Sequence, residues 1–345
     1  MALYFYITLI SLIIHFVLIV PFINFLYKKK FQRANQTTRD AFDKPTPIFD
    51  SFHKHKTGIP VGGGLVILGI TSLLTLFFVG SFRFFDIYTH TNYPSILIEL
   101  VILLFSFLSF GLLGIFDDLN KIFLWEKKQF FGLRLRVKLI IEIILALIIS
   151  SALFFSLQIS IIYIPFFGVF DLSYFYILFA SFVIVAFANA INITDGLDGL
   201  ASGVLLIALI SFWSVARSII DVPISIFIAV WIGGMIAFLY FNIYPARIFL
   251  GDTGALSFGA TFAVIGLLLG KSFALPIIGG IFVLEIASSF IQLVSKKYFG
   301  KKFFQAAPLH LLLQSKGWEE PKIVMRFWVF SIVFALFGLM IAFLK

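Results

Sequence analysis

The stretch SILIELVILLFSFLSFGLLGIFDD, residues 95–118, decides the fold class of this chain. Before its last two residues it carries a single charged side chain, Glu99. A transmembrane helix needs about 20 predominantly apolar residues, so this run is long enough to cross a bilayer. It then stops at two adjacent carboxylates, Asp117 and Asp118. The stretch therefore predicts a membrane-spanning helix that ends in an acidic pair.

The composition of the whole chain extends this pattern. Hydrophobic residues make up 61% and charged residues 12%, with a mean hydropathy of +1.08, which excludes a soluble globular enzyme. No stretch alternates polar and apolar residues as the strands of an outer-membrane barrel do. We therefore predict an all-α, polytopic membrane protein of about ten transmembrane helices, organised as a single domain over residues 1–345. The apolar runs lie at about 2–27, 61–80, 95–116, 138–160, 174–193, 199–216, 224–243, 254–270, 275–294 and 323–344.

Basic residues give the expected orientation. When the sides alternate from the flank Lys28–Lys30, most of the 26 Lys and Arg residues fall in one set of loops. The positive-inside rule assigns that set to the cytoplasm and both termini to the outside. The net charge of +9 is thus mostly a signal of topology, and loops this short predict no nucleic-acid partner. The absence of Cys excludes disulfides and thiolate metal sites.

Several polar residues are not explained by topology. Carboxylates stand at the ends of separate predicted helices, and a lysine and a histidine lie in loops on the same, cytoplasmic side. Each has a simpler interpretation, because an acidic pair can be solvated, an Asp at a helix start is routinely an N-cap, and a lone loop histidine usually has no role. Their common side nevertheless predicts one active site at the cytoplasmic face. Its candidate members are Lys56, Asp117, Asp118, Asp195, Asp198, Asp252 and His310.

The chemistry of these side chains indicates phosphoryl transfer. Convergent carboxylates without Cys form a hard oxygen site, which suits Mg²⁺ or Mn²⁺. Lys56, Lys121 and His310 are available to neutralise phosphate oxygens, and a site at the membrane boundary can take a lipid substrate. A transporter is the alternative from another class, but it predicts acids at mid-membrane and an inverted repeat, and neither is visible in the sequence.

Five motifs resemble those of the polyprenyl-phosphate N-acetylhexosamine-1-phosphate transferases, in the same order and over nearly the whole chain. They are Lys56–Pro60 with Gly63 and Gly64, Asp117–Lys121, Asn189–Leu200, Phe249–Asp252, and Pro308–His310 followed by Lys316–Trp318. The Asn189–Leu200 block and the tail from Lys316 to Trp328 are most similar to the branch that uses a muramoyl-pentapeptide donor. Lys121 also favours that branch, because the GlcNAc-1-phosphate transferases usually carry a third Asp in this motif.

The resemblance implies transfer of phospho-N-acetylmuramoyl-pentapeptide from UDP-MurNAc-pentapeptide to undecaprenyl phosphate, giving lipid I and UMP, with Mg²⁺. It also implies a role in peptidoglycan synthesis, a multi-pass location in the bacterial inner (cytoplasmic) membrane, and a homodimer. The alternative within the family is a sister enzyme that transfers GlcNAc-1-phosphate or another sugar phosphate to the same lipid.

The resemblance also implies roles for individual residues. Asp252 would be the magnesium ligand, and Asp117 would act on the lipid phosphate. Asp118 and His310 would complete the catalytic group. The expected substrate-binding residues are Lys56, Lys121, Asn189, Asn192, Ile193, Asp195, Asp198 and Phe249, with Asn192, Ile193, Asp198 and Phe249 near the uridine and Lys56, Lys121 and His310 near phosphates.

Three features depart from the family or stand apart from its motifs. The family pattern Pro-Ile-His-His-His appears here with Leu311 and Leu312 in place of two histidines, and leucine can neither donate a hydrogen bond nor carry charge. A smaller departure is Val61-Gly62 where the family has Thr-Met. Glu142 and Glu285 fall within predicted spans, where an ionisable group is costly, and we interpret Glu285 as a structural or lipid-groove residue.

Two mechanisms fit this site. The lipid phosphate can attack the donor directly, or an Asp can form a covalent intermediate first. We favour direct attack, because a phosphate monoester has a second pKa near about 6 and is already largely dianionic at neutral pH.

Overall fold

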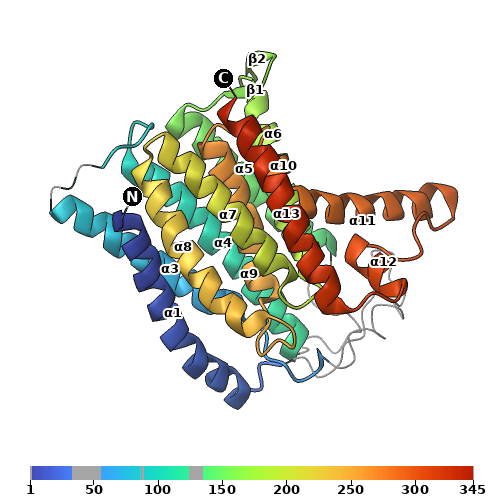
Figure 1. Ribbon diagram of the computed structural model, residues 1–345. Helices are drawn as coiled ribbons and strands as arrows, with labels where there is room; N and C mark the ends of the chain where they lie inside the picture. Colours follow the sequence, from blue (N-terminus) through green and yellow to red (C-terminus); the bar gives the residue numbers. More distant parts are fainter. Residues whose placement is uncertain (1, 33–55, 86, 88, 124–134, 345) are drawn as a thin grey trace.

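The computed structural model describes residues 2–32, 56–85, 87, 89–123 and 135–344. It is a bundle of α-helices with one small hairpin (Figure 1), which confirms the predicted all-α polytopic fold. Within the described residues, nine helices are long and apolar enough to cross a membrane. The elements are α1 (Ala2–Lys28), α3 (Gly63–Phe84), α4 (Ile96–Phe123), α5 (Leu135–Leu157), β1 (Ile161–Ile164), β2 (Gly168–Asp171), α6 (Phe175–Thr194), α7 (Leu200–Ser218), α8 (Val222–Asn242), α9 (Gly251–Leu268), α10 (Leu275–Ile278), α11 (Gly280–Phe299), α12 (Leu309–Ser315) and α13 (Glu320–Phe343).

The predicted run at 275–294 differs from a single straight span. Helix α10 ends at Gly279, and α11 begins at the next residue and projects sideways from the bundle (Figure 1). Two consecutive glycines weaken helix continuity at this point. They also sit against rings: a Cβ on Gly279 would lie 2.8 Å from the Phe187 ring, and one on Gly280 would lie 2.6 Å from Phe334.

Helix α9 forms the centre of the bundle, where it packs against α4 and α6 and every one of its residues is buried. Its small residues allow neighbouring backbones to approach closely. A Cβ on Gly259 would lie 2.3 Å from the carbonyl oxygen of Phe187 in α6, and a Cβ on Gly64 in α3 would lie 2.2 Å from the amide nitrogen of Gly254. Glycine is therefore required at both crossings.

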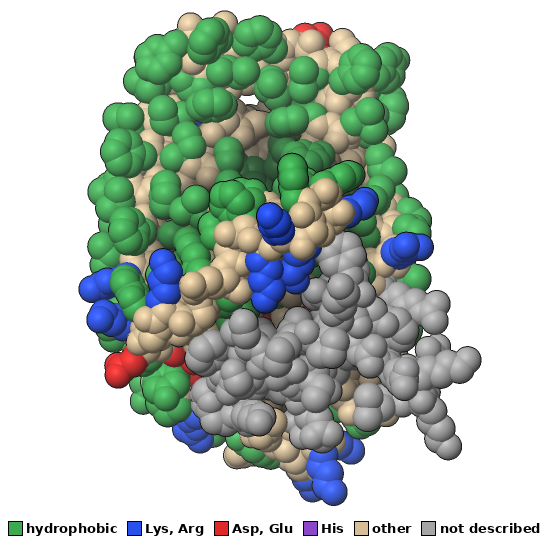
Figure 2. Space-filling model, turned by 90° about the vertical axis from the view of Figure 1, so that its right-hand side faces the viewer, with side chains coloured by type: hydrophobic (Ala, Val, Ile, Leu, Met, Phe, Trp, Pro, Cys, Tyr) green, Lys and Arg blue, Asp and Glu red, His purple; other side chains and the backbone are tan. Residues whose placement is uncertain are grey.

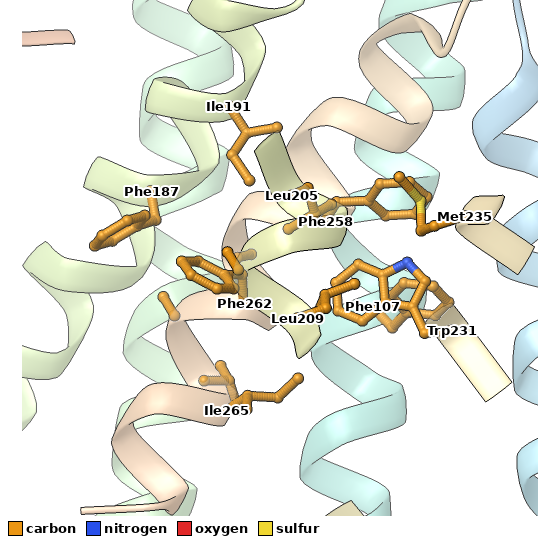
Figure 3. Packing of buried hydrophobic residues seen from close by; sticks show 14 of the residues in the cluster. Phe107, Phe187, Ile191, Leu205, Leu209, Trp231, Met235, Phe258, Phe262 and Ile265 are labelled. Atoms are coloured by element: carbon orange, nitrogen blue, oxygen red, sulfur yellow. The ribbon is translucent and has the colours of Figure 1, made fainter. Parts of the chain in front are cut away.

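Aromatic rings fill the interior beside α9 (Figure 3). The Phe107 ring of α4 stacks on Phe258 of α9 with centroids 5.7 Å apart, and Trp231 of α8 meets Phe258 edge-on at 5.1 Å. Farther along α9, the ring of Phe262 packs edge-on against Phe187 of α6 at 5.5 Å. Such pairs stabilise a core by about 0.5–1.5 kcal/mol each beyond the area they bury. They fix α9 relative to α4, α6 and α8.

The direction of each helix determines which helix ends lie together at one end of the bundle. Helix α1 finishes, α4 ends, and α9 and α13 begin at one end of the bundle. The residues before α3 pair there with both the end of α1 and the loop before α9, Asp118 contacts the start of α9, and Lys56 reaches Glu320. The start of α1 and the end of α13 therefore lie at the opposite end of the bundle. The antiparallel β1–β2 hairpin joins α5 to α6 there. That the α4–α9 end faces the cytoplasm stays a prediction from the basic loops.

Candidate active site

The first turn of α9 is capped by a residue from another helix. The side chain of Asp118, at the end of α4, accepts the backbone N–H groups of Asp252 at 3.1 Å and Thr253 at 2.9 Å, and the Thr253 hydroxyl at 2.8 Å. The residue at the N-cap position itself, Leu250, makes no side-chain cap. Asp252 is therefore not the N-cap of α9, and its carboxylate is available for the site. Asp118, which we expected among the catalytic groups, positions Asp252.

Two carboxylates and two ammonium groups form the centre of the site. Asp117 Oδ2 lies 3.1 Å from Lys121 Nζ and 3.0 Å from Lys138 Nζ. Asp252 lies 2.8 Å from Lys121 through Oδ1 and 2.5 Å from Lys138 through Oδ2. All except Lys121, which keeps 14% of its side-chain surface, are buried. Each carboxylate thus shares the same two cations, which balances the charge of the group.

Lys138 is the member of this centre that the sequence analysis missed. It stands near the start of the apolar run at 138–160, where we counted it among the loop charges that set orientation. A signal was present in Glu142, which is one helical turn further along α5 and also buried. The amide of Asn189 donates to Glu142 at 2.5 Å. Asn189, which we expected to bind substrate, therefore contacts Glu142, one helical turn beyond Lys138.

A second buried network holds Lys56. Its ammonium group lies 2.7 Å from Asp198 Oδ1 and 2.5 Å from Glu320 Oε1, at the first residue of α13. Glu320 Oε1 also accepts the backbone N–H of Asp198 at 2.6 Å, and Asp198 Oδ2 accepts the N–H of Ala246 at 2.9 Å. Glu320 was part of the tail motif in the sequence but was not assigned a role. The network ties the loop before α3, the turn after α6, the loop after α8 and the start of α13 together.

Backbone pairing brings Phe249 to this network. Phe249 donates its N–H to Pro60 at 2.9 Å, and its carbonyl accepts the N–H groups of Gly62 at 3.2 Å and Gly63 at 2.8 Å. The Lys56 ammonium lies 6.0 Å from the centre of the Phe249 ring. Lys56, Asp198 and Phe249, which come from three separate motifs, therefore lie next to one another.

His310 is buried between α11 and the turn after α6. Its Nδ1 lies 3.0 Å from Glu285 Oε2, and its backbone N–H donates to Glu285 Oε1 at 3.1 Å. A Cβ on Gly196 would lie 2.5 Å from His310 Nε2, so the imidazole rests against the Asp195–Asp198 turn. The interpretation of Glu285 as structural is consistent with this contact, because Glu285 fixes the ring of His310.

The remaining predicted residues border these networks. Asn192 Nδ2 lies 3.4 Å from Asp252 Oδ2, and Ile193 and Asp195 are half-buried in the last turn of α6 and at its C-terminal end. Leu311, one of the two departures from the histidine pattern, is buried, and Leu312 is half-buried. Asp117, Asp252, Lys121, Lys56, Asp198, Phe249, Asn192 and His310 thus all lie at one end of the bundle.

The donor set consists of carboxylate oxygens, which suit Mg²⁺ or Mn²⁺ better than zinc. Asp117 and Asp252 contact the same pair of ammonium groups, so their oxygens lie close together around Lys121 and Lys138. Among the described residues no group of three or more His, Cys, Asp or Glu side chains could form a metal cage. Mg²⁺ suits this arrangement, because it usually binds one or two carboxylates and completes its shell with water and substrate phosphate.

A buried carboxylate pair with two lysines can do one kind of chemistry well. The lysines attract anionic phosphates, and the carboxylates can hold a metal ion or orient an attacking oxygen. The neighbouring Lys56–Phe249 group places an ammonium group beside the face of an aromatic ring.

Comparisons with known proteins agree with this description. Residues 100–270 match the family model described as Glycosyl transferase family 4. The chain is 37% identical over 313 residues to the phospho-N-acetylmuramoyl-pentapeptide-transferase of Caldanaerobacter subterraneus subsp. tengcongensis, with 90% of each protein aligned. It is 38% identical over 307 residues to the enzyme of that name from Rickettsia canadensis, covering 83% of this chain and 80% of the relative. It is 36% identical over 317 residues to that of Acetivibrio thermocellus, covering 89% and 86%.

Proposed function

The chain belongs to the phospho-N-acetylmuramoyl-pentapeptide-transferase family, and on that premise we propose that it transfers phospho-N-acetylmuramoyl-pentapeptide from UDP-MurNAc-pentapeptide to undecaprenyl phosphate, forming lipid I and UMP. It is a transferase and a multi-pass membrane protein. Its proposed location is the bacterial cytoplasmic membrane. The site is proposed to face the cytoplasm, because the basic loops lie at the same end of the helix bundle as the site.

The observation that carries this proposal is the convergence of Asp117 and Asp252 on Lys121 and Lys138 at the end of the bundle. The reaction joins two anionic partners, so its main requirement is fixed positive charge beside the reacting phosphates. The lysines supply that charge. The position at the end of membrane-spanning helices lets one partner remain in the bilayer while the other arrives from water.

The reaction proceeds by direct attack in this proposal. A phosphate oxygen of the lipid bonds to the β-phosphorus of the donor, and the bond from that phosphorus to the bridging oxygen breaks, so that UMP leaves with the electron pair. Asp117 orients the acceptor or removes a residual proton, and Asp118 keeps Asp252 in place. Asp198 and Phe249 bind the uridine end of the donor, Lys56 lies near its phosphates, and Asn192 lies between the two groups.

Magnesium would be held by Asp252, with Asp117 as the second carboxylate. When bound, it would supply further positive charge to the pyrophosphate oxygens. Mn²⁺ offers the same oxygen-directed chemistry.

The test is UMP release by the purified protein in detergent with undecaprenyl phosphate and Mg²⁺. UDP-MurNAc-pentapeptide and UDP-GlcNAc are compared as donors, because Leu311 and Leu312 distinguish this chain from the histidine pattern. Release with the pentapeptide donor alone supports the proposal. Release with UDP-GlcNAc alone reassigns the chain to the sister reaction, and release with neither contradicts both.

Lys138 provides a prediction that the sequence did not suggest. Lys138→Met leaves Asp117 and Asp252 sharing only Lys121, and removing one partner of a buried ion pair typically costs about 3–5 kcal/mol. We expect UMP release to fall at least about 100-fold, together with a lower midpoint of thermal unfolding. Arg136→Met is the matched control, since Arg136 is exposed two residues earlier on α5. Unchanged activity in Lys138→Met would remove Lys138 from the proposed site.

Glu320 provides a prediction about donor affinity. Glu320→Gln can still accept the Asp198 N–H, but Lys56 then keeps one carboxylate partner instead of two. Hydrogen bonds to charged groups contribute about 1.5–3 kcal/mol, so we expect the KM for the UDP donor to rise roughly tenfold, with kcat within about twofold. The adjacent exposed Glu319→Gln should match the wild type. Equal KM values in the two variants would show that Glu320 does not act on the donor pocket.

A further inference from the structure

The segment KKYFGKKFF, residues 296–304, is a basic and aromatic surface feature that the transferase site does not use. It combines Lys pairs with aromatic residues, and we call it the basic tip. No Asp or Glu occurs in the sequence between Glu285 and Glu319, so this basic stretch has no acidic neighbours along the chain. A basic and aromatic segment of this kind is typical of a surface that meets the boundary between water and lipid.

The fold carries the basic tip away from the bundle. The tip lies at the far end of α11, the helix that turns away at Gly279 and projects sideways (Figure 1). Figure 2 views this side of the molecule, where Lys and Arg side chains gather along a projecting ridge in front of a hollow lined by hydrophobic side chains. The chain then returns to the bundle through α12, which holds His310.

Hydrogen bonds hold the basic tip in a defined shape. The buried side chain of Gln292 donates to the Phe304 carbonyl at 3.0 Å and accepts the N–H groups of Phe303 at 3.1 Å and Phe304 at 2.8 Å. The Ser295 hydroxyl donates to the Lys301 carbonyl at 2.8 Å. Gly300 adopts φ 64°, the left-handed conformation that ends α11 and turns the chain back. The tip is therefore folded against α11.

This shape displays rings and ammonium groups together. Tyr298, Phe299 and Phe303 are 71%, 73% and 67% exposed, values at which large aromatic side chains are unfavourable in water. Lys297, Lys301 and Lys302 are also exposed. Phe290, which lies earlier on α11, is 66% exposed as well. The rings need an apolar environment and the adjacent ammonium groups need anions, which is the combination that an anionic bilayer surface provides.

We propose that the basic tip docks on anionic phospholipids, with the Lys groups on headgroup phosphates and the aromatic rings at the edge of the acyl layer. The docking fixes the free end of α11 at the membrane surface. Because α11 holds Glu285 and α12 holds His310, lipid contact at the tip is linked by structure to the wall of the active site. The proposal does not depend on which sugar phosphate the enzyme transfers.

A site-specific quenching experiment tests this proposal, since the chain has no Cys and a single introduced Cys can be labelled uniquely. Gln305→Cys puts a bimane fluorophore beside the tip without changing it, and Phe77→Cys labels a lipid-facing position of α3 that is 64% exposed. Each protein is placed in bilayer discs of mixed phosphatidylcholine and phosphatidylglycerol, with bromine atoms carried by one lipid or the other. The ratio of quenching by the two brominated lipids reports local lipid composition.

We expect phosphatidylglycerol to be enriched at residue 305 at least about threefold over its bulk fraction, because each Lys near an anionic surface attracts it, and to show no enrichment at residue 77. High salt screens surface charges. With the native tip sequence, 1 M NaCl should therefore bring the ratio of local to bulk phosphatidylglycerol at residue 305 close to one. Exchanging Lys297, Lys301 and Lys302 for Gln should do the same at low salt. Lys28, Lys29 and Lys30 replaced by Gln at the end of α1 form the matched control, which should leave the ratio at 305 unchanged.

The measurement at 1 M NaCl uses the native tip sequence, so the test remains decisive even if the triple Lys variant folds poorly. A ratio near one at residue 305 at low salt in the unmodified tip would overturn the proposal. Equal enrichment at residues 77 and 305 would overturn it as well, because the preference would then belong to the whole protein.

Discussion

Asp252→Asn should reduce UMP release by at least about 10³-fold in a protein that still folds, with a lower midpoint of thermal unfolding because Lys121 and Lys138 lose one of their two carboxylate partners. The substitution keeps the size of the side chain but removes the negative charge that pairs with Lys121 and Lys138 and that would hold the metal. A charged group at a reacting centre commonly accounts for 10²–10³ in rate on its own, and loss of the metal would add to this effect. The measurement is UMP release with the pentapeptide donor, alongside the midpoint of thermal unfolding in detergent.

Two further variants separate chemistry from structure in this experiment. Asp118→Asn should lower both the activity and the unfolding midpoint, because Asp118 accepts three hydrogen bonds from the first turn of α9. Asp171→Asn, on the exposed hairpin at the opposite end, should change neither. If Asp252→Asn retains more than about a tenth of wild-type activity, Asp252 is not the residue on which the reaction depends.

The second large effect is expected at Gly114, a residue of α4 that has no side chain of its own to act in the site. A Cβ added there would lie 2.3 Å from the carbonyl oxygen of Asp252, which is backbone and cannot rotate away. Gly114→Ala must therefore push α9 away from α4. Overpacking of this kind costs about 1–3 kcal/mol, and a misplacement of about 1 Å in a catalytic group can reduce the rate about 100-fold.

Gly69→Ala is the control for this prediction. It also replaces a glycine within a membrane helix, but a Cβ at Gly69 would meet nothing within 4 Å. The unfolding midpoint and the rate of UMP release should both fall for Gly114→Ala and stay unchanged for Gly69→Ala. Equal behaviour of the two variants would show that the α4–α9 contact does not control the site.

Much of the fold followed from the sequence, because the length of an apolar run in a membrane protein reports a physical dimension of the bilayer. The exception, the run at 275–294, was apolar enough on average to count as a span. Its break depends on Gly279 and Gly280 meeting the rings of Phe187 and Phe334, which come from distant segments. Contacts of that kind leave no trace in local hydropathy.

The candidate site was predicted in position more fully than in detail. The acids at helix ends could be assigned to one side, yet Asp117 and Asp118 looked equivalent as neighbours. Successive helical residues point about 100° apart, so Asp117 faces Lys121 and Lys138 while Asp118 faces the start of α9. Lys138 was hidden by its resemblance to a topological charge. Whether a lysine at the edge of a span points into the bundle depends on tertiary packing.

The ion pair between Lys56 and Glu320 joins residues 264 positions apart, near the two extremes of the chain. During synthesis, the first helices emerge long before the last one exists. Lys56 and the backbone N–H of Asp198 have no access to the Glu320 carboxylate until α13 is made, so this buried network is completed late in synthesis. A chain truncated before Glu320 should therefore still form the earlier helices, while Lys56 and the Asp198 N–H lack the carboxylate that joins them.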